Sequence, residues 1–139
     1  MRQKILVAED QRDTLDLVGF SLSAEGYDII TAATGLEALK QARATLPDLI
    51  ILDATLPDID GATVCDILRR LPSTAPTPIL MLTNQTESGP SDVGLFKRAD
   101  HYLAKPFTPT ELASRVTQTM SRWEEENVER GADWSVTLS

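Results

Sequence analysis

Short apolar segments alternate five times with longer amphipathic segments along this 139-residue chain, and this alternation restricts its fold more than any other feature. The apolar segments are mostly rich in β-branched or bulky residues, as β-strands are. We expect strands at Lys4–Ala8, Tyr27–Thr31, Asp48–Asp53, Pro78–Leu82 and His101–Ala104. Three of them are almost continuously apolar, which is typical of strands covered on both faces of a sheet.

Helical periodicity fills the segments between these strands. The apolar stripes that indicate the first three helices are Leu15, Val18 and Leu22, then Leu36 and Leu39, then Val64, Leu68 and Leu71. The fourth helix is the weakest, because Ser88-Gly89-Pro90 breaks its start and Gly94 lies inside it. If the chain moves during function, this element is a candidate for the moving part.

The last helix has the best-marked start in the chain. Thr108 suits the N-cap and Pro109 the first helical position, while Glu111 completes a capping box. An apolar stripe then continues through Leu112, Val116, Met120 and Trp123. We expect the regular pattern to end there.

Five strand–helix units predict an α/β fold, a doubly wound (βα)5 sandwich around a five-stranded parallel sheet. Units of this length most often take the strand order 2-1-3-4-5. Ligands of such sheets bind beyond the carboxyl ends of the strands where the order reverses, here between the first and third strands. A functional site is therefore expected at that place.

Length and composition indicate one compact domain in a reducing, cytoplasmic setting. The single cysteine, Cys65, excludes an intramolecular disulfide and is expected to be a small core residue. No apolar run is long enough for a membrane span, and the first residues lack the pattern of a signal peptide. The net charge of −8 argues against direct binding of nucleic acid.

Three carboxylates are expected to meet at the predicted crevice. Glu9 and Asp10 follow the first strand, and Asp53 ends the third. Like charges brought together repel one another and raise pKa values, and a hard divalent cation such as Mg²⁺ relieves that repulsion. The pattern therefore predicts a magnesium site.

A hydroxyl and an ammonium group extend the expected site. The fourth strand ends at Thr83 and the fifth at Lys105, on the same rim as Asp53. A metal and a lysine neutralise phosphoryl oxygens, while a hydroxyl donates to them. An ionised aspartate is already nucleophilic, so Asp53 would need no separate base. Each residue alone is ordinary, and only their joint placement suggests phosphoryl chemistry.

At these spacings the sequence resembles the receiver domain of bacterial response regulators. The motifs are ILVAED (Ile5–Asp10), DLIILDATLPDIDG (Asp48–Gly61), MLT (Met81–Thr83) and HYLAKPF (His101–Phe107). The resemblance covers residues 3–123 and implies a flavodoxin-like fold. It also implies a signalling switch of a two-component system rather than an enzyme, with a sensor histidine kinase or phosphotransfer protein as its phosphoryl donor.

The resemblance implies roles for the residues of the crevice. Asp53 matches the phospho-acceptor, Glu9 and Asp10 the metal-binding acid pair, and the backbone carbonyl of Thr55 a further Mg²⁺ ligand. The loop that shapes the pocket matches Pro57 and Gly61.

Further matches concern the conformational switch. Thr83 matches the switch hydroxyl and Tyr102 the aromatic residue that turns inward on activation. Lys105 matches the family lysine, whose bond to Pro106 is cis by analogy. Together they imply that phosphorylation changes the face formed by the fourth helix and the fifth strand.

Two departures from the family pattern stand out. Asn84 replaces a small residue beside Thr83 and is expected to crowd the rim of the pocket. His101 replaces an acid that joins a salt-bridge network across a dimer face in transcription-factor relatives. A homodimer through the fourth and fifth helices therefore keeps only part of its usual charges, namely Lys97, Asp100, Glu111 and Arg115. We expect His101 to be exposed, either as an ordinary surface residue or as a pH-sensitive contact.

Two rival functions follow from the same residues. A haloacid-dehalogenase-type phosphatase also uses a strand-end aspartate with Mg²⁺, but it needs a second acid where this chain has Thr55. A receiver that has lost phosphorylation would serve only as a docking module. The intact acids disfavour that reading, whereas Asn84 favours it slightly.

The expected domain division is a receiver domain at 1–123 and a C-terminal extension at 124–139. The extension begins as an acidic helix end at Glu124–Glu126 and alternates apolar and polar residues from Trp134 to Leu138. Three readings of that tail stay open: the first strand of a missing output domain, a segment that docks on a neighbour, or a disordered end. The chain is thus either a stand-alone receiver acting on a downstream protein or a piece of a longer regulator.

Overall fold

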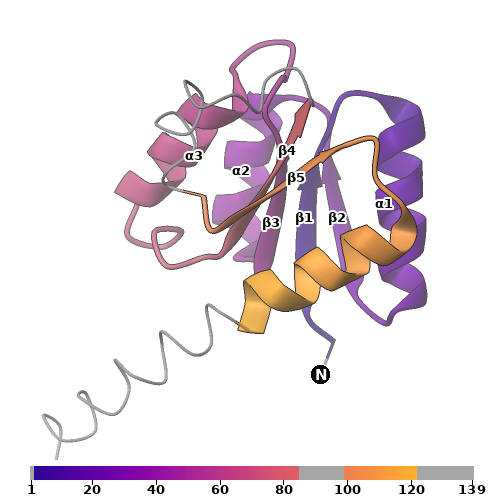
Figure 1. Ribbon diagram of the computed structural model, residues 1–139. Helices are drawn as coiled ribbons and strands as arrows, with labels where there is room; N and C mark the ends of the chain where they lie inside the picture. The colour runs from indigo at the N-terminus through magenta and orange to yellow at the C-terminus, as the bar shows by residue number, and fades with distance from the viewer. Residues whose placement is uncertain (1, 85–98, 122–139) are drawn as a thin grey trace, which may run out of the picture.

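The computed structural model describes residues 2–84 and 99–121, in which five parallel strands form one sheet (Figure 1). The strands are β1 (Lys4–Ala8), β2 (Asp28–Ala32), β3 (Leu49–Asp53), β4 (Ile79–Asn84) and β5 (His101–Lys105). Their order is β2-β1-β3-β4-β5, which confirms the predicted doubly wound, flavodoxin-like α/β class. Every predicted strand boundary lies within two residues of the observed one.

The helices cover both faces of the sheet. They are α1 (Arg12–Ala24), α2 (Gly35–Thr45), α3 (Gly61–Arg70) and a helix at 109–121, here called the C-terminal helix. Figure 1 shows α2 and α3 on one side of the sheet, and α1 with the C-terminal helix on the other. The fourth predicted helix, Trp123 and the predicted extension at 124–139 lie outside the described residues.

Strand alternation divides the core into two layers. Leu6 and Ala8 of β1 face the cluster under α2 and α3, which also holds the buried Cys65 as predicted. Ile5 and Val7 face the cluster under α1 and the C-terminal helix. Because both faces of the central strands are buried, β1 and β3 need the nearly continuous apolar sequence from which they were predicted. None of the described helices combines the length and apolar character that a membrane crossing requires.

The C-terminal helix begins at the predicted capping box. The Thr108 hydroxyl accepts the Glu111 N–H at 3.1 Å, and the Glu111 carboxylate accepts the Thr108 N–H at 3.0 Å. Leu112, Val116 and Met120 are buried on the sheet as the stripe predicted. The capping residue Thr108 follows Lys105, the last residue of β5, by three residues, so the helix start is close in sequence to the end of that strand.

The prediction that Leu36 faces the core is wrong. Its side chain is 67% exposed, whereas Gly35, Ala38 and Ala42 form the buried face of α2. A β-carbon on Gly35 would lie 3.0 Å from the side chain of Ile59 and 3.0 Å from that of Val64 on α3. Small residues on this face therefore let α2 lie close to the loop and helix that follow β3, a requirement that hydrophobic periodicity does not reveal.

Candidate functional site

Three acidic side chains meet where the strand order reverses. Glu9 and Asp10 directly follow β1, and Asp53 is the last residue of the neighbouring strand β3. One oxygen from each carboxylate lies within 4.8 Å of the others. The sequence predicted this convergence from the parallel topology, because carboxyl ends of neighbouring parallel strands share one edge.

The three acids differ in burial. Glu9 is fully buried and Asp53 is 4% exposed, whereas Asp10 is exposed. Backbone contacts hold the first of them: the Glu9 N–H donates to Ala32 O at 3.0 Å, and Glu9 Oε2 accepts the Gln11 N–H at 3.1 Å. The site thus has a buried floor and an open acidic rim.

Lys105 supplies a positive charge to this floor. Its Nζ lies 2.7 Å from Glu9 Oε1 and 3.3 Å from Asp53 Oδ1, and its side chain is 15% exposed. The following peptide bond to Pro106 is cis, as the family resemblance implied. One ammonium therefore bridges the two buried carboxylates.

Burial and the Glu9 carboxylate raise the pKa of Asp53 to about 7, although Lys105 and the Thr55 N–H oppose the shift. The pKa of Glu9 moves the other way. Burial disfavours its charge, but hydrogen bonds with Asp53, Lys105 and the Gln11 N–H lower the pKa of Glu9 below its usual range. The expectation that repulsion raises the pKa values of the acids is therefore right for Asp53 and wrong for Glu9. Glu9 lies closer than Asp53 to Lys105 Nζ and to its backbone N–H donor.

The donor set suits a hard divalent cation. Apart from the ion pair with Lys105, Glu9 Oε1 accepts no hydrogen bond within the described part of the chain, although it is buried. Carboxylate oxygens with an open, water-accessible side are what Mg²⁺ binds. The residues present therefore fit the predicted metal.

Thr83 and Tyr102 take the positions expected of them. Thr83 is 3% exposed on β4, one residue beyond Leu82, which pairs with Asp53. Tyr102 is half-buried on β5 and packs against the core cluster that contains Cys65. Burial, with Cys65 and Asp100 nearby, raises the pKa of the Tyr102 hydroxyl. Thr83 therefore lies on the strand next to that of Asp53, and Tyr102 lies on the strand that ends at Lys105.

Of the two residues that depart from the family pattern, Asn84 lies where we expected and His101 does not. Asn84 is exposed and borders a hollow of about 380 Å³ with Gln11 and Lys105, which agrees with a place on the rim. His101 is half-buried rather than exposed as expected, because it pairs with Leu80 inside the ladder of β4 and β5.

Two of the predicted dimer charges have partners within the chain. Asp100 pairs with Arg69 at 2.9 Å, and Glu111 belongs to the capping box. The dimer prediction is not tested by these contacts, but both carboxylates would have to serve two roles in it. Lys97 lies outside the described residues.

Sequence reasoning missed Asp58. Its carboxylate accepts the N–H groups of Gly35 at 2.7 Å and Leu36 at 2.9 Å, so it caps α2 from the loop that follows Asp53. These backbone hydrogen bonds lower the pKa of Asp58. The capped helix start lies 23 residues away in sequence, so no local pattern could have identified this contact.

Gly61 allows α3 to begin directly against the site. A β-carbon there would lie 2.3 Å from the backbone oxygen of Asp53, and the Gly61 N–H donates to Ala54 O at 2.8 Å. Only glycine permits this approach. The resemblance assigned Gly61 to the loop that shapes the pocket, whereas the structure makes it the first residue of α3, directly after that loop.

Known proteins are similar to this chain in sequence and in architecture. Residues 5–117 match the family described as the response regulator receiver domain. The chain is 44% identical over 124 residues to the alkaline phosphatase synthesis transcriptional regulatory protein PhoP of Bacillus subtilis, covering 89% of this chain and 51% of the relative. It is 38% identical over 129 residues to the DNA-binding response regulator MtrA of Mycobacterium tuberculosis, covering 93% of this chain and 55% of the relative.

Solved structures agree with the relatives. The chemotaxis response regulator CheY4 of Vibrio cholerae superposes with a TM-score of 0.80 at 33% identity, covering 86% of this chain and 99% of that one. The chain spans about half the length of the curated relatives it matches. The chain therefore belongs to the family of response regulator receiver domains, the signalling switches of two-component systems.

Proposed function

We propose that Asp53 accepts a phosphoryl group from the phosphohistidine of a sensor histidine kinase or phosphotransfer protein. The observation that carries the proposal is the placement of the Asp53 carboxylate, which is nearly buried and lies 3.3 Å from Lys105 Nζ. Glu9, Asp10, Asp53 and the backbone carbonyl of Thr55 would hold Mg²⁺. When bound, the metal supplies positive charge to the phosphoryl oxygens.

The chemistry requires no additional base. An ionised Asp53 oxygen attacks phosphorus while the bond from phosphorus to the imidazole nitrogen of the donor breaks, and the donor histidine leaves with its electron pair. Lys105 neutralises charge on the transferring group, and the Thr83 hydroxyl donates to a phosphoryl oxygen. The product is an aspartyl phosphate and a free histidine.

The phosphorylated state is expected to differ in packing. A phosphoryl group on Asp53 draws the Thr83 hydroxyl toward it, and Tyr102 moves into the space that Thr83 leaves. The face of the fourth helix and β5 then changes, as a population shift between two packings. A downstream protein or an output domain reads that face.

We infer that residues 1–123 form the receiver and that 124–139 lead out of it. Two relatives, of which this chain covers about half, are named as a transcriptional regulatory protein and a DNA-binding response regulator. By that likeness the receiver would control an output domain if it belongs to a longer protein, and a downstream protein if it acts alone. The net charge of −8 supports a receiver that does not itself grip nucleic acid. A cytoplasmic location fits this role.

The test is incubation with acetyl phosphate and Mg²⁺ followed by intact mass spectrometry. We expect one added phosphoryl group on the wild-type chain, none on Asp53→Asn, and none when the metal is chelated. Asp13→Asn is the control, because Asp13 is an exposed acid in the first turn of α1. Labelling that persists in Asp53→Asn, or robust turnover of a general phosphate ester, would contradict the proposal.

A further inference from the structure

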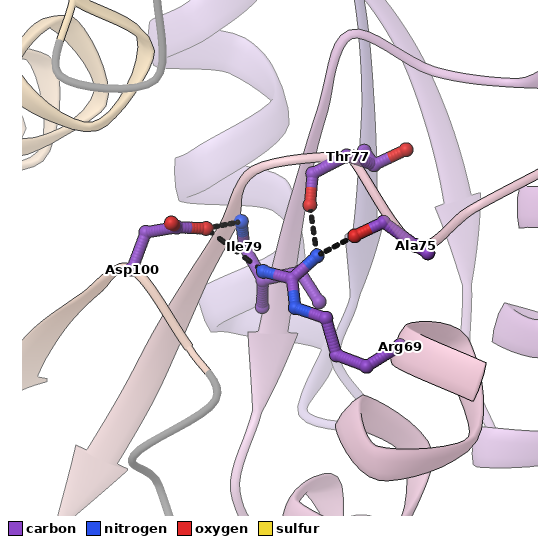
Figure 2. A network of polar contacts seen from close by, with 5 residues as sticks. All are labelled: Arg69, Ala75, Thr77, Ile79 and Asp100. Atoms are coloured by element: carbon purple, nitrogen blue, oxygen red, sulfur yellow. Dashed lines mark hydrogen bonds and ion pairs between the residues drawn. The ribbon is translucent and has the colours of Figure 1, made fainter. Parts of the chain in front are cut away.

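A polar network joins α3 to the beginning of β5 at the end of the sheet opposite the acidic site (Figure 2). Arg69, in the last turn of α3, donates from Nη1 to the backbone oxygens of Ala75 and Thr77, and from Nη2 to Asp100 Oδ2 at 2.9 Å. The side chains of Arg69 and Asp100 are 16% and 23% exposed. The guanidinium therefore ties together three stretches of chain in a partly desolvated place.

Asp100 also binds the first residue of β4 twice. Its Oδ2 accepts the Ile79 N–H at 2.8 Å, and its own N–H donates to the Ile79 backbone oxygen at 2.9 Å. The ladder of β4 and β5 starts with the next pair, Leu80 with His101. Asp100 thus binds β4 at the point where β5 starts to pair with it.

The register of β5 determines where its functional side chains lie. Tyr102 pairs with Met81, and Lys105, at the far end of the strand, pairs with Asn84. A slip by one residue would turn every β5 side chain to the other face of the sheet and shift it by about 3 Å along the strand. The 2.7 Å contact between Lys105 Nζ and Glu9 would not survive that change.

We propose that Arg69 and Asp100 are positioning residues that set the register of β5 on β4 and so hold Lys105 at the carboxylates of Glu9 and Asp53. Neither residue touches the site, and both act through the strand. The register claim stands on the contacts alone, whereas its consequence for phosphoryl transfer rests on the proposed function of Asp53.

The contacts of this network require both the guanidinium of Arg69 and the carboxylate of Asp100. A guanidinium presents several N–H groups in a planar fork, which lets one side chain reach two carbonyls and a carboxylate at once. A lysine at position 69 offers one ammonium and cannot match that geometry. An asparagine at position 100 keeps an oxygen for the Ile79 N–H but loses the charge that pairs with Arg69.

The first measurement is amide hydrogen exchange of the unphosphorylated chain in Arg69→Lys and Asp100→Asn. We expect amide exchange in β5 to speed up roughly tenfold or more, because both substitutions weaken the charged hydrogen bonds of Arg69 and Asp100 just before that strand. Exchange in β1 and β2 should change much less. The control is Arg70→Lys, since Arg70 forms an exposed ion pair with Asp66 at 3.1 Å on the same helix.

Two results would overturn the register claim. One is unchanged exchange in β5 of both variants, and the other is an equal rise in all strands, which would reflect only global stability. This measurement does not require phosphorylation, so it decides the claim even if Asp53 proves not to accept a phosphoryl group.

The second measurement is the rate of labelling by acetyl phosphate as a function of Mg²⁺. We expect the maximal rate to fall roughly tenfold to a hundredfold in both variants, because Lys105 is misplaced. The Mg²⁺ concentration at half-maximal rate should change much less, since Glu9 and Asp10 follow β1 and Asp53 ends β3, so none of the three acids lies on β5. Wild-type rates in both variants would contradict the positioning role, whereas an unlabelled wild-type chain would instead contradict the proposed function.

Discussion

At the scale of single residues, the site depends on how two buried acids share one cation. Glu9 and Asp53 both contact Lys105 and each accepts a backbone N–H, but both contacts of Glu9 are shorter, and Glu9 keeps its charge at a lowered pKa. Asp53 carries the opposite shift, with a pKa raised to about 7. The charged form of Asp53, the proposed nucleophile, is thus less stabilised than that of Glu9.

The raised pKa of Asp53 predicts a pH-dependent gain in stability for Asp53→Asn in the metal-free chain. The folded state binds this proton more tightly than the unfolded state, so ionisation destabilises the fold as pH rises from about 4 through about 7. At pH 8 the variant should be more stable by up to about 4 kcal/mol, since each pKa unit between the unfolded and folded values is worth about 1.4 kcal/mol.

Urea denaturation of both proteins between pH 4 and pH 8 checks this. The difference in free energy of unfolding should shrink toward zero near pH 4. A constant difference across the range would show that Asp53 does not titrate as proposed.

The contact with Lys105 predicts the effect of removing its charge. Lys105 lowers the pKa of Asp53, so Lys105→Gln should raise that pKa above about 7 in the metal-free chain. Carboxyl ¹³C chemical shifts followed through a pH titration would report it. Lys4→Gln is the control, because Lys4 begins β1 and binds the Thr45 backbone oxygen at 2.7 Å instead. An unchanged or lowered pKa of Asp53 would contradict the ion-pair geometry.

At the scale of elements, helix starts and strand ends set the geometry. Patterns within a few residues were predictable: the capping box at Thr108 and the apolar strand β3 both match the sequence reading. Contacts between elements were not, which is why Leu36 was placed wrongly on the buried face of α2. The close approach of α2 to α3 depends on small residues whose role appears only when the helices are packed.

Among the described glycines, Gly61 has the closest backbone neighbour that an added β-carbon would meet. Gly61→Ala would put a β-carbon 2.3 Å from the Asp53 backbone oxygen, and we expect a loss of roughly 1–3 kcal/mol of stability, as overpacking usually costs. The matched control is Gly19→Ala in α1, where the nearest atom would be 3.9 Å away. That change should stabilise by about 0.4–1 kcal/mol.

Thermal or chemical denaturation of both glycine variants provides the comparison. Equal effects of the two substitutions would mean that the start of α3 adjusts freely, and the close packing at the site would then not be essential.

At the scale of the whole molecule, the parallel topology explains why so much of the site was predictable. Once the strand order is known, Glu9, Asp53, Thr83 and Lys105 must share one edge of the sheet, and the structure places them there. Contacts between residues far apart in sequence escaped prediction. Arg69 and Asp100 are 31 residues apart, and their meeting depends on the final register of β5.

Metal binding should stabilise the entire domain through linkage, because the acidic cluster exists only in the folded chain. At Mg²⁺ concentrations about 100 times the dissociation constant, the gain should be about 2.7 kcal/mol. Differential scanning fluorimetry with Mg²⁺, and again after chelation, would measure it. Asp10→Asn should weaken the response, and Asp13→Asn should retain it. A response equal in both variants would place the metal elsewhere.

The most direct test of the central claim identifies the residue that carries the phosphoryl group. The chain is labelled with acetyl phosphate and Mg²⁺, reduced with borohydride to convert an aspartyl phosphate to homoserine, and sequenced by peptide mass spectrometry. The proposed function predicts homoserine at position 53 and at no other aspartate. Homoserine at another position, or none in a chain that gained a phosphoryl group, would contradict it.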